Sequence, residues 1–120
     1  MKRNVLIEIT RGFDMDEQTL SKSDSKLVET AINELVKTTR KGEWPKKLYR
    51  THGVIFPQGI LSKYSTLYMY KVTTSHIVIL TLDEDPLFNQ RIIKLMRIAK
   101  REESTEIFNN VANLIYSNGN

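Results

Sequence analysis

The chain has 120 residues, a hydrophobic fraction of 40% and no cysteine. This length suits a single domain, residues 1–120, because each half alone would have too small a core, and the lack of thiols excludes disulfides, cysteine catalysis and cysteine-bound zinc. Eighteen Lys and Arg residues against 14 Asp and Glu residues give a net charge of +4, which favours a polyanionic partner such as RNA, DNA or an acidic protein segment.

The N-terminal quarter predicts a short strand and a loop. Residues 5–9 are mostly apolar and are closed by Arg11 and Gly12, which indicates a strand. No apolar run approaches the roughly 18 residues of a membrane span, so we expect a soluble, cytoplasmic protein with no membrane partner. Residues 11–25 are largely polar and contain three serines, which predicts a loop.

Residues 25–40 predict the first helix. Ser23 or Asp24 offers an N-cap, Gly42 a C-cap, and Pro45 prevents the helix from resuming nearby. One face carries apolar side chains at helical spacing: Leu27, Val28, Ala31, Ile32, Leu35 and Val36.

The middle of the chain predicts strands. Residues 48–50 suit a short strand, and residues 53–59 suit a turn-rich excursion. Residues 66–73 and 76–82 are rich in Tyr, Val, Ile and Thr and predict an antiparallel hairpin around a compact turn. Residues 83–86, three acids and a proline, are expected to end the second strand.

The pattern of residues 90–101 fits either a helix or a buried strand, and periodicity does not separate the two. Residues 106–116 predict a final helix that Ser104 or Thr105 can cap.

From Leu67 onward the chain shows a hairpin, a further apolar segment, a basic Lys-Arg-Glu corner and a closing helix. These parts are Tyr68-Met69-Tyr70-Lys71-Val72, His76-Ile77-Val78-Ile79-Leu80, Leu95-Met96-Arg97-Ile98-Ala99-Lys100-Arg101-Glu102 and Glu106-Ile107-Phe108, after an entry segment Trp44-Pro45-Lys46-Lys47-Leu48. In this order and spacing the chain resembles RelE/ParE-type toxins of bacterial toxin–antitoxin pairs. The resemblance extends from Leu67 to the C-terminal end and covers the helix at 25–40 by position only.

The resemblance implies an α+β fold, in which a small antiparallel sheet packs against one or two N-terminal helices and a C-terminal helix. It also implies that residues 90–101 form a strand. Residues 67–101 would then be three neighbouring antiparallel strands that bring Lys71 and Arg101 to the same rim.

Ribonucleases of this family cut messenger RNA on the ribosome, generally without a metal, and use lysines and arginines of the sheet and an aromatic hydroxyl near the last helix. Attack of a 2′-OH on the adjacent phosphate needs a proton acceptor, cations and a proton donor. By resemblance, the catalytic cations fall on Lys71 and Arg101. The family's other groups fall on Met69, near Val78 and on Phe108, none of which can supply this chemistry.

Two basic runs, residues 37–50 and 91–101, are candidate nucleic-acid contacts. The residues that we assign to this role are Lys46, Lys47, Arg50, Arg97 and Lys100. The alternative is a solvated face beside the acids of residues 102–106.

Aromatic and histidine residues have structural alternatives. Trp44, Tyr49 and Tyr64 can stack on bases, although closing a core edge is the preferred interpretation for Trp44. His52 and His76 fit a loop and a turn better than a metal site, and no cofactor is expected.

Two functions follow from the resemblance. The first is a metal-independent ribonuclease that acts on messenger RNA at the ribosome. The second is a non-enzymatic toxin-fold protein that inhibits a target such as DNA gyrase, or an inactive relative that only binds, which Met69, Val78 and Phe108 favour. Either function implies a cognate antitoxin, with an acidic amphipathic segment that covers an apolar groove beside the N-terminal helices and the sheet.

Overall fold

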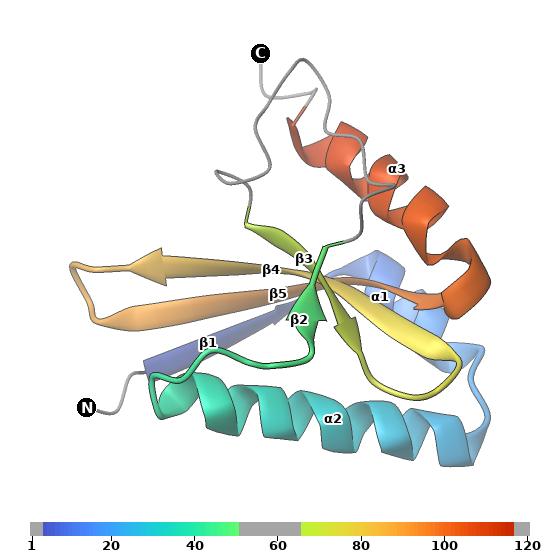
Figure 1. The fold of residues 1–120 in the computed structure, drawn as a ribbon, viewed down its shortest axis with the longest axis horizontal. Helices are drawn as coiled ribbons and strands as arrows, with labels where there is room; N and C mark the ends of the chain where they lie inside the picture. Colours follow the sequence, from blue (N-terminus) through green and yellow to red (C-terminus); the bar gives the residue numbers. More distant parts are fainter. Residues whose placement is uncertain (1–3, 51–65, 117–120) are drawn as a thin grey trace.

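The computed structural model describes residues 4–50 and 66–116. The strands are β1 Asn4–Ile9, β2 Leu48–Tyr49, β3 Leu67–Lys71, β4 His76–Asp85 and β5 Gln90–Lys100. The helices are α1 Arg11–Gln18, α2 Lys22–Arg40, the 3-10 turn η3 Arg101–Glu103 and α3 Ser104–Tyr116. Within the described residues the strands form one sheet in the order β1-β5-β4-β3-β2 (Figure 1).

The α+β class is confirmed, as are the hairpin and the strand at residues 90–100. The sheet is not wholly antiparallel, however, because β1 pairs with β5 in parallel and the other neighbours pair antiparallel. The reason is topological: the chain leaves β1 through two helices and three strands before β5 returns beside it, so no hairpin forces opposite directions.

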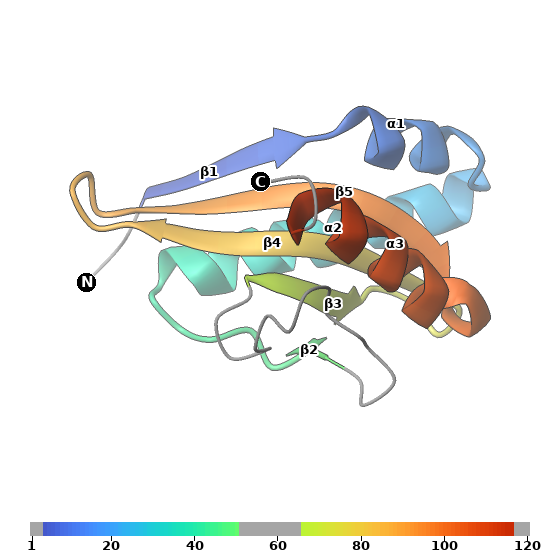
Figure 2. The ribbon, with the colours of Figure 1, turned by 90° about the horizontal axis from the view of Figure 1, so that it is seen from above.

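Helices cover both faces of the sheet. Figure 2 shows α2 and α3 on opposite sides of β3 and β4, with α1 beyond the end of β1. The α2 side buries Phe13, Val28, Ala31, Leu35, Leu48, Tyr70, Val78, Leu80, Leu82, Ile93, Leu95 and Ile98. The α3 side buries Leu67, Met69, Ile77, Ile79, Ala99, Phe108, Val111 and Ala112. Alternate residues of β3 and β4 therefore enter two different cores, which explains why these strands are almost continuously apolar.

The loop predicted for residues 11–25 is wrong, because most of this segment is helical. Thr10 caps α1 by accepting a hydrogen bond from the Phe13 backbone N–H at 3.2 Å, and Phe13 is the residue that α1 buries. A single buried side chain among polar ones leaves no helical stripe to detect in the sequence.

Helix α2 begins three residues before the predicted start. Its N-cap is Ser21, whose hydroxyl accepts from the Asp24 N–H at 3.1 Å, and not Ser23 or Asp24. Several Ser and Asp residues compete for this role, and only the turn after α1 decides among them. Leu27, placed on the apolar face by its spacing, stays exposed.

Gly42 ends α2 as predicted, with a φ of 82°. The Gly42 N–H donates to the Thr39 carbonyl at 3.0 Å, and the Glu43 N–H donates to the Thr38 carbonyl at 3.2 Å. This Schellman pattern needs a residue in the left-handed region, where glycine meets no Cβ penalty.

Strand β4 runs through all three acids that were expected to end it. Its partner β5 continues beside it, pairing Asp83 with Ile92 and Glu84 with Arg91. Glu84 and Arg91 form an ion pair at 2.9 Å, so the acidic end of β4 is compensated across the hairpin.

Helix α3 begins at Ser104, two residues before the predicted start, directly after η3. The Ser104 hydroxyl donates to the Arg101 carbonyl at 2.8 Å, so it stabilises the η3 corner. The predicted excursion at 53–59, His52 and Tyr64 lie outside the described residues. In the parts that the structure describes, no helix is long and apolar enough to cross a membrane.

Candidate functional site

Lys71 and Arg101 lie at the same end of the sheet, as the family resemblance implied. Lys71 is the last residue of β3 and pairs with Ile77, which in turn pairs with Ala99 of β5. The Arg101 N–H donates to the Ser75 carbonyl at 2.9 Å, which joins the β5 corner to the β3–β4 turn. Both basic side chains are exposed. We call this end of the sheet, with Lys71 and Arg101, the basic rim.

Tyr49 lies next to the basic rim on the α3 side. It pairs with Met69, and alternation along β3 places Met69 and Lys71 on the same face. Burial raises the pKa of Tyr49, and the positive charge of Arg101 lowers it by a smaller amount. Arg101 is therefore close enough to favour charge on the Tyr49 oxygen. No sequence signal joins these residues, because the register of the two-residue strand β2 follows from packing.

The other positions that the family resemblance singles out are part of the core. Met69 and Phe108 are both 0% exposed and belong to the cluster beneath α3, together with Ile79. Val78 is also 0% exposed and faces the cluster beneath α2. At these positions the chain presents hydrocarbon and a thioether to other apolar side chains, with no group that transfers a proton.

Arg97 is held in an ion pair with Asp16 of α1. The Arg97 Nε lies 2.7 Å from Asp16 Oδ2, and Nη2 lies 3.1 Å from Oδ1. The hydrogen bond that Arg97 donates to Asp16 is the main cause that raises the pKa of Arg97. The same Oδ2 accepts from the Ile98 N–H at 2.9 Å, so Asp16 binds the backbone of β5 as well as the guanidinium.

Gly12 makes room for this arrangement. A Cβ at Gly12 would come within 2.9 Å of the Arg97 Cδ and 3.3 Å of the Met96 carbonyl oxygen. Helix α1 thus provides both the space for the Arg97 side chain, at Gly12, and the carboxylate that neutralises its charge, on Asp16.

Lys100 lies on the opposite face from Lys71. It pairs with His76 and lines a pocket of about 400 Å³ that also contains Asp16, Asp24 and Glu103. Arg91 is buried and paired with Glu84. Two cations of the basic run at 91–101, Arg91 and Arg97, are thus ion-paired with Glu84 and Asp16, and Lys100 lies on the opposite face from Lys71, so the run does not form one surface with Lys71.

His76 belongs to the β3–β4 turn. Its N–H donates to the Thr73 hydroxyl at 2.9 Å, and its Nδ1 lies 3.2 Å from the hydroxyls of Thr73 and Ser75. Among residues 4–50 and 66–116, no three His, Asp or Glu side chains gather in a way that could hold a metal ion.

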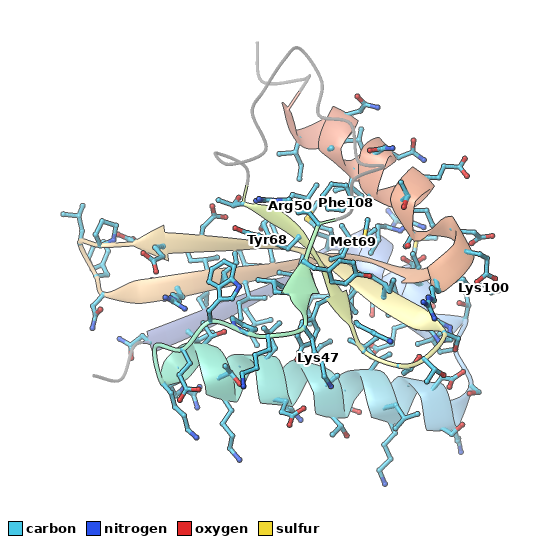
Figure 3. All side chains as sticks on the ribbon, viewed as in Figure 1. Lys47, Arg50, Tyr68, Met69, Lys100 and Phe108 are labelled. Carbon is cyan, nitrogen blue, oxygen red and sulfur yellow. The ribbon has the colours of Figure 1, made fainter. Side chains whose placement is uncertain are left out.

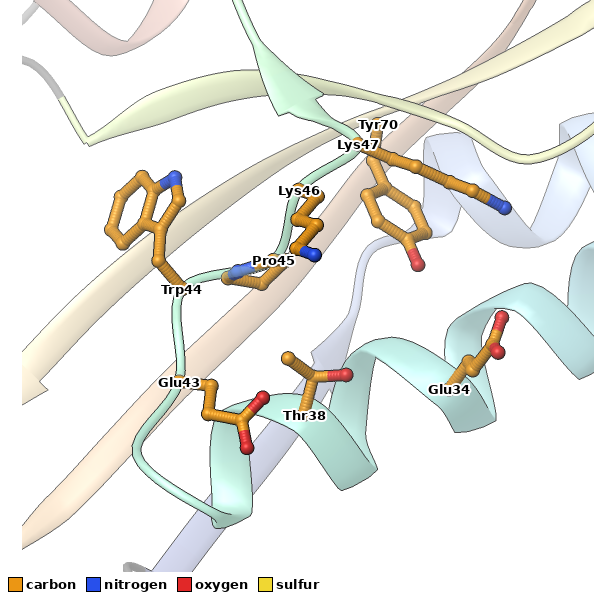
Figure 4. A pocket seen from close by; sticks show the side chains of 8 residues that line it. All are labelled: Glu34, Thr38, Glu43, Trp44, Pro45, Lys46, Lys47 and Tyr70. Carbon is orange, nitrogen blue, oxygen red and sulfur yellow. The ribbon is translucent and has the colours of Figure 1, made fainter.

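The segment between α2 and β2 forms a second basic surface. Lys46 and Lys47 are exposed and line a pocket of about 210 Å³ with Trp44 and residues of α2 (Figure 4). In Figure 3, Lys47 lies on the α2 side of the sheet and Phe108 on the α3 side. Lys47 also lines a separate pocket with Lys71.

Arg50 follows β2 and contacts Leu67 and Tyr68. Its Nε donates to the Leu67 carbonyl at 3.0 Å, and its guanidinium carbon lies 4.1 Å from the centre of the Tyr68 ring. The indole of Trp44 contacts the same Tyr68 ring edge-to-face, with 5.4 Å between ring centres.

No family model and no curated protein matches the chain. Among solved structures, it is similar to a chain of the RelB–RelE antitoxin–toxin complex from Methanococcus jannaschii, with 13% identity, coverage of 84% of this chain and 98% of that chain, and a TM-score of 0.48. It is also similar to the YoeB/ParE toxin from Agrobacterium tumefaciens, with 12% identity, coverage of 80% and 98%, and a TM-score of 0.47. Both likenesses are with proteins of the type that the sequence resembles. They concern the fold alone, and since one fold serves many functions, the function has to be argued from the residues of this chain.

Proposed function

We propose that this chain is the toxin of a toxin–antitoxin pair and that it inhibits its target by binding, without cutting RNA. The order of elements supports the toxin assignment: the β3–β4 hairpin, β5, the basic corner and the closing helix α3 follow the order that the resemblance requires. Lys71 and Arg101 lie at one rim of that sheet.

The burial of Met69 and Phe108 is the observation that favours binding over cleavage of RNA. Both are fully buried where the ribonucleases of the family place an ammonium and an aromatic hydroxyl. Cleavage through a 2′-OH needs a proton acceptor and a proton donor besides cations. Lys71 and Arg101 hold anionic groups without supplying both proton transfers, so the rim is suited to binding.

The target that we propose is RNA at the ribosome. A net charge of +4 and the exposed cations of the basic rim favour a polyanion. A protein target such as DNA gyrase is the alternative.

A second candidate function, a metal-independent ribonuclease, is favoured by Tyr49. Its hydroxyl lies within the electrostatic influence of Arg101, on the same face of the sheet as Lys71. With an ordinary pKa of 10.0 a tyrosine hydroxyl is protonated at neutral pH, and the charge of Arg101 offsets part of the rise in the pKa of Tyr49 that burial causes, so this hydroxyl can donate a proton to a leaving oxygen.

Translating ribosomes incubated with the purified protein separate these functions. Translation arrest with intact messages is the expected result, and arrest should be weaker with Arg101→Ala and Lys71→Ala. New message ends that disappear with Tyr49→Phe would support the ribonuclease instead. Growth inhibition without any effect on translation would indicate another target, such as DNA gyrase. The absence of growth inhibition would contradict the toxin assignment.

We also propose that an antitoxin covers the groove between β1 and α2. This groove of about 500 Å³ has an apolar floor that includes Ile7, Ile9 and Ile32, and its charged lining side chains are the carboxylates Glu17 and Glu29. These carboxylates disfavour the acidic segment that the resemblance led us to expect here, so the segment that enters the groove should be apolar with basic flanks, and acidic parts of an antitoxin should meet the basic rim. Ile9→Asp should weaken co-purification with the product of a neighbouring small gene, whereas the exposed change Leu87→Asp should not.

A further inference from the structure

We propose that Trp44, Lys46 and Lys47 form a binding site for one nucleotide of single-stranded RNA, with the base stacked on Trp44 and the phosphates held by the two lysines. The site is separate from the Lys71–Arg101 rim. It depends on the proposed function only for the origin of the RNA, since binding itself can be measured with purified components.

Trp44 has the properties of a stacking platform. Trp44 is 54% exposed, although tryptophan is a residue that proteins usually bury in large part. The contact with Tyr68, which in turn lies under Arg50, fixes the orientation of the indole. A ring that is held in place and open to solvent can stack on any base at little cost in side-chain entropy.

The lysines supply the phosphate contacts. Lys46 and Lys47 follow Trp44 after the buried Pro45, whose ring fixes the backbone between the indole and the ammonium groups. Lys47 lines both the Trp44 pocket and the pocket of Lys71. Cations thus continue from the stacking platform to the basic rim, and a single strand can follow them.

The far wall of the pocket offers acceptors for the base. Glu34 and Thr38 of α2 and Glu43 line it, as the close view in Figure 4 shows. Carboxylates oppose phosphates but accept hydrogen bonds from the exocyclic amines of cytosine, adenine and guanine. We therefore expect oligo(C) and oligo(A) to bind more tightly than oligo(U), with the base directed toward α2.

A cationic peptide is the competing occupant, because an aromatic ring beside carboxylates also attracts Lys and Arg side chains. RNA is favoured by the two exposed ammonium groups of the consecutive residues Lys46 and Lys47, which balance the two carboxylates of the pocket and continue toward Lys71.

The test uses the fluorescence of Trp44, which is the only tryptophan of the chain. Titration with ten-residue oligo(C), oligo(A) and oligo(U) at low salt should quench the emission and saturate, and duplex RNA should quench it less. Binding of labelled oligo(C), followed by anisotropy, should weaken on the order of tenfold in Trp44→Ala and in the double variant Lys46→Ala/Lys47→Ala. Trp44→Phe should retain part of the affinity.

The matched control is Lys22→Ala/Lys26→Ala, which removes the same charge from exposed lysines at the other end of α2. Equal losses in the control and the site variant would reduce the effect to net charge and overturn the proposal. Absence of quenching by every oligonucleotide, or quenching by an oligo-lysine peptide alone, would also overturn it. Urea unfolding of each variant shows that the fold is retained.

The outcomes remain separable from those of the proposed function. Oligonucleotide binding at Trp44 without translation arrest would contradict the proposed function and leave this site established. Translation arrest that is unchanged in Trp44→Ala and in the double lysine variant would support the rim and exclude this site from the toxin's action.

Discussion

Single buried side chains determine which chemistry the α3 side of the sheet can perform. Met69 lies between Tyr68 and Tyr70 on β3, is fully buried and packs in the same cluster as Phe108 and Ile79. An ammonium group at this depth would lose its hydration without gaining a partner, which costs several kcal/mol. The catalytic lysine that the resemblance expects here is therefore incompatible with the packing of α3.

Met69→Lys should lower the free energy of unfolding by about 3–5 kcal/mol, because it leaves a buried charge without a partner. Met69→Leu, which conserves volume and polarity, should cost less than about 1.5 kcal/mol. Urea unfolding followed by circular dichroism measures both. A Lys variant as stable as the Leu variant would mean that α3 detaches easily and that this face is accessible.

Tyr70 makes stability depend on alkaline pH. It is buried, and its hydroxyl donates to the Ala31 carbonyl at 3.3 Å. Burial, and to a lesser degree the charge of Glu34, raises the pKa of Tyr70 above its ordinary value of 10.0. The folded state thus keeps the proton of Tyr70 at a pH where the unfolded chain loses it. The contribution of Tyr70 to the free energy of unfolding is therefore fully present below pH 10.0 and is lost as the pH rises above it.

Tyr70→Phe should cost about 1 kcal/mol at pH 8 through the lost hydrogen bond. Above pH 10 its free energy of unfolding should fall less steeply with pH than that of the parent protein. Part of the slope should persist, because burial raises the pKa of Tyr49 as well. Unfolding curves at several pH values measure the two slopes, and parallel curves would contradict the assignment.

At the scale of elements, α1 takes over the edge of β5 where β1 ends. Strand β1 pairs with β5 as far as Ile9 and Leu95, and a β-bulge follows at Met96. The Thr10 hydroxyl lies 3.0 Å from the Leu95 carbonyl oxygen and 2.9 Å from that of Met96, and Asp16 accepts from the Ile98 N–H. A short helix thus replaces a strand as the hydrogen-bonding partner of an irregular edge.

Asp16→Ala should destabilise the protein by about 2 kcal/mol, mainly through the lost acceptor for the Ile98 N–H. The ion pair contributes little to this figure because the Arg97 side chain is 39% exposed and screened by solvent. Asp16→Asn, which keeps an acceptor oxygen, should lose less. Denaturant unfolding and exchange of the Ile98 amide measure the effect, and equal losses in both variants would assign the stabilisation to charge.

For the whole molecule, two cores share the central strands. Consecutive residues Val78, Ile79 and Leu80 of β4 are fully buried, alternately beneath α2 and beneath α3. The outer strands differ: β1 leaves Leu6, Ile7 and Ile9 partly exposed, and β2 has two residues. Stability should therefore decrease from the centre of the sheet toward its edges.

Amide hydrogen exchange should follow this order. Amides of β4 that are bonded to β3 and β5 should exchange only through global unfolding, whereas amides near the β1 edge and in β2 should exchange through smaller openings. Exchange rates measured by NMR at increasing urea concentration test this. If β1 were protected as strongly as β4, another segment would have to cover that edge.

Local patterns were enough to predict several elements. These are the apolar stripe of α2, the glycine that ends it and the β-branched run of β4. Each depends on residues that are close in sequence, so each can be predicted without tertiary information. The strand at 90–100 required the family resemblance, because its apolar pattern fits a helix equally well.

The amino-acid sequence by itself determined the α+β class, the β3–β4 hairpin and the cationic character of residues 46–50 and 91–101. Only the tertiary structure decided that α1 is a helix, that Asp16 neutralises Arg97 and that Lys100 and Lys71 face opposite sides of the sheet. The physical reason is that these features depend on strand register, on the bulge at Met96 and on partners about 80 residues apart in the chain. A charge pattern along the sequence shows how many cations are present, and the packing of strands and helices determines which of them can meet the same ligand.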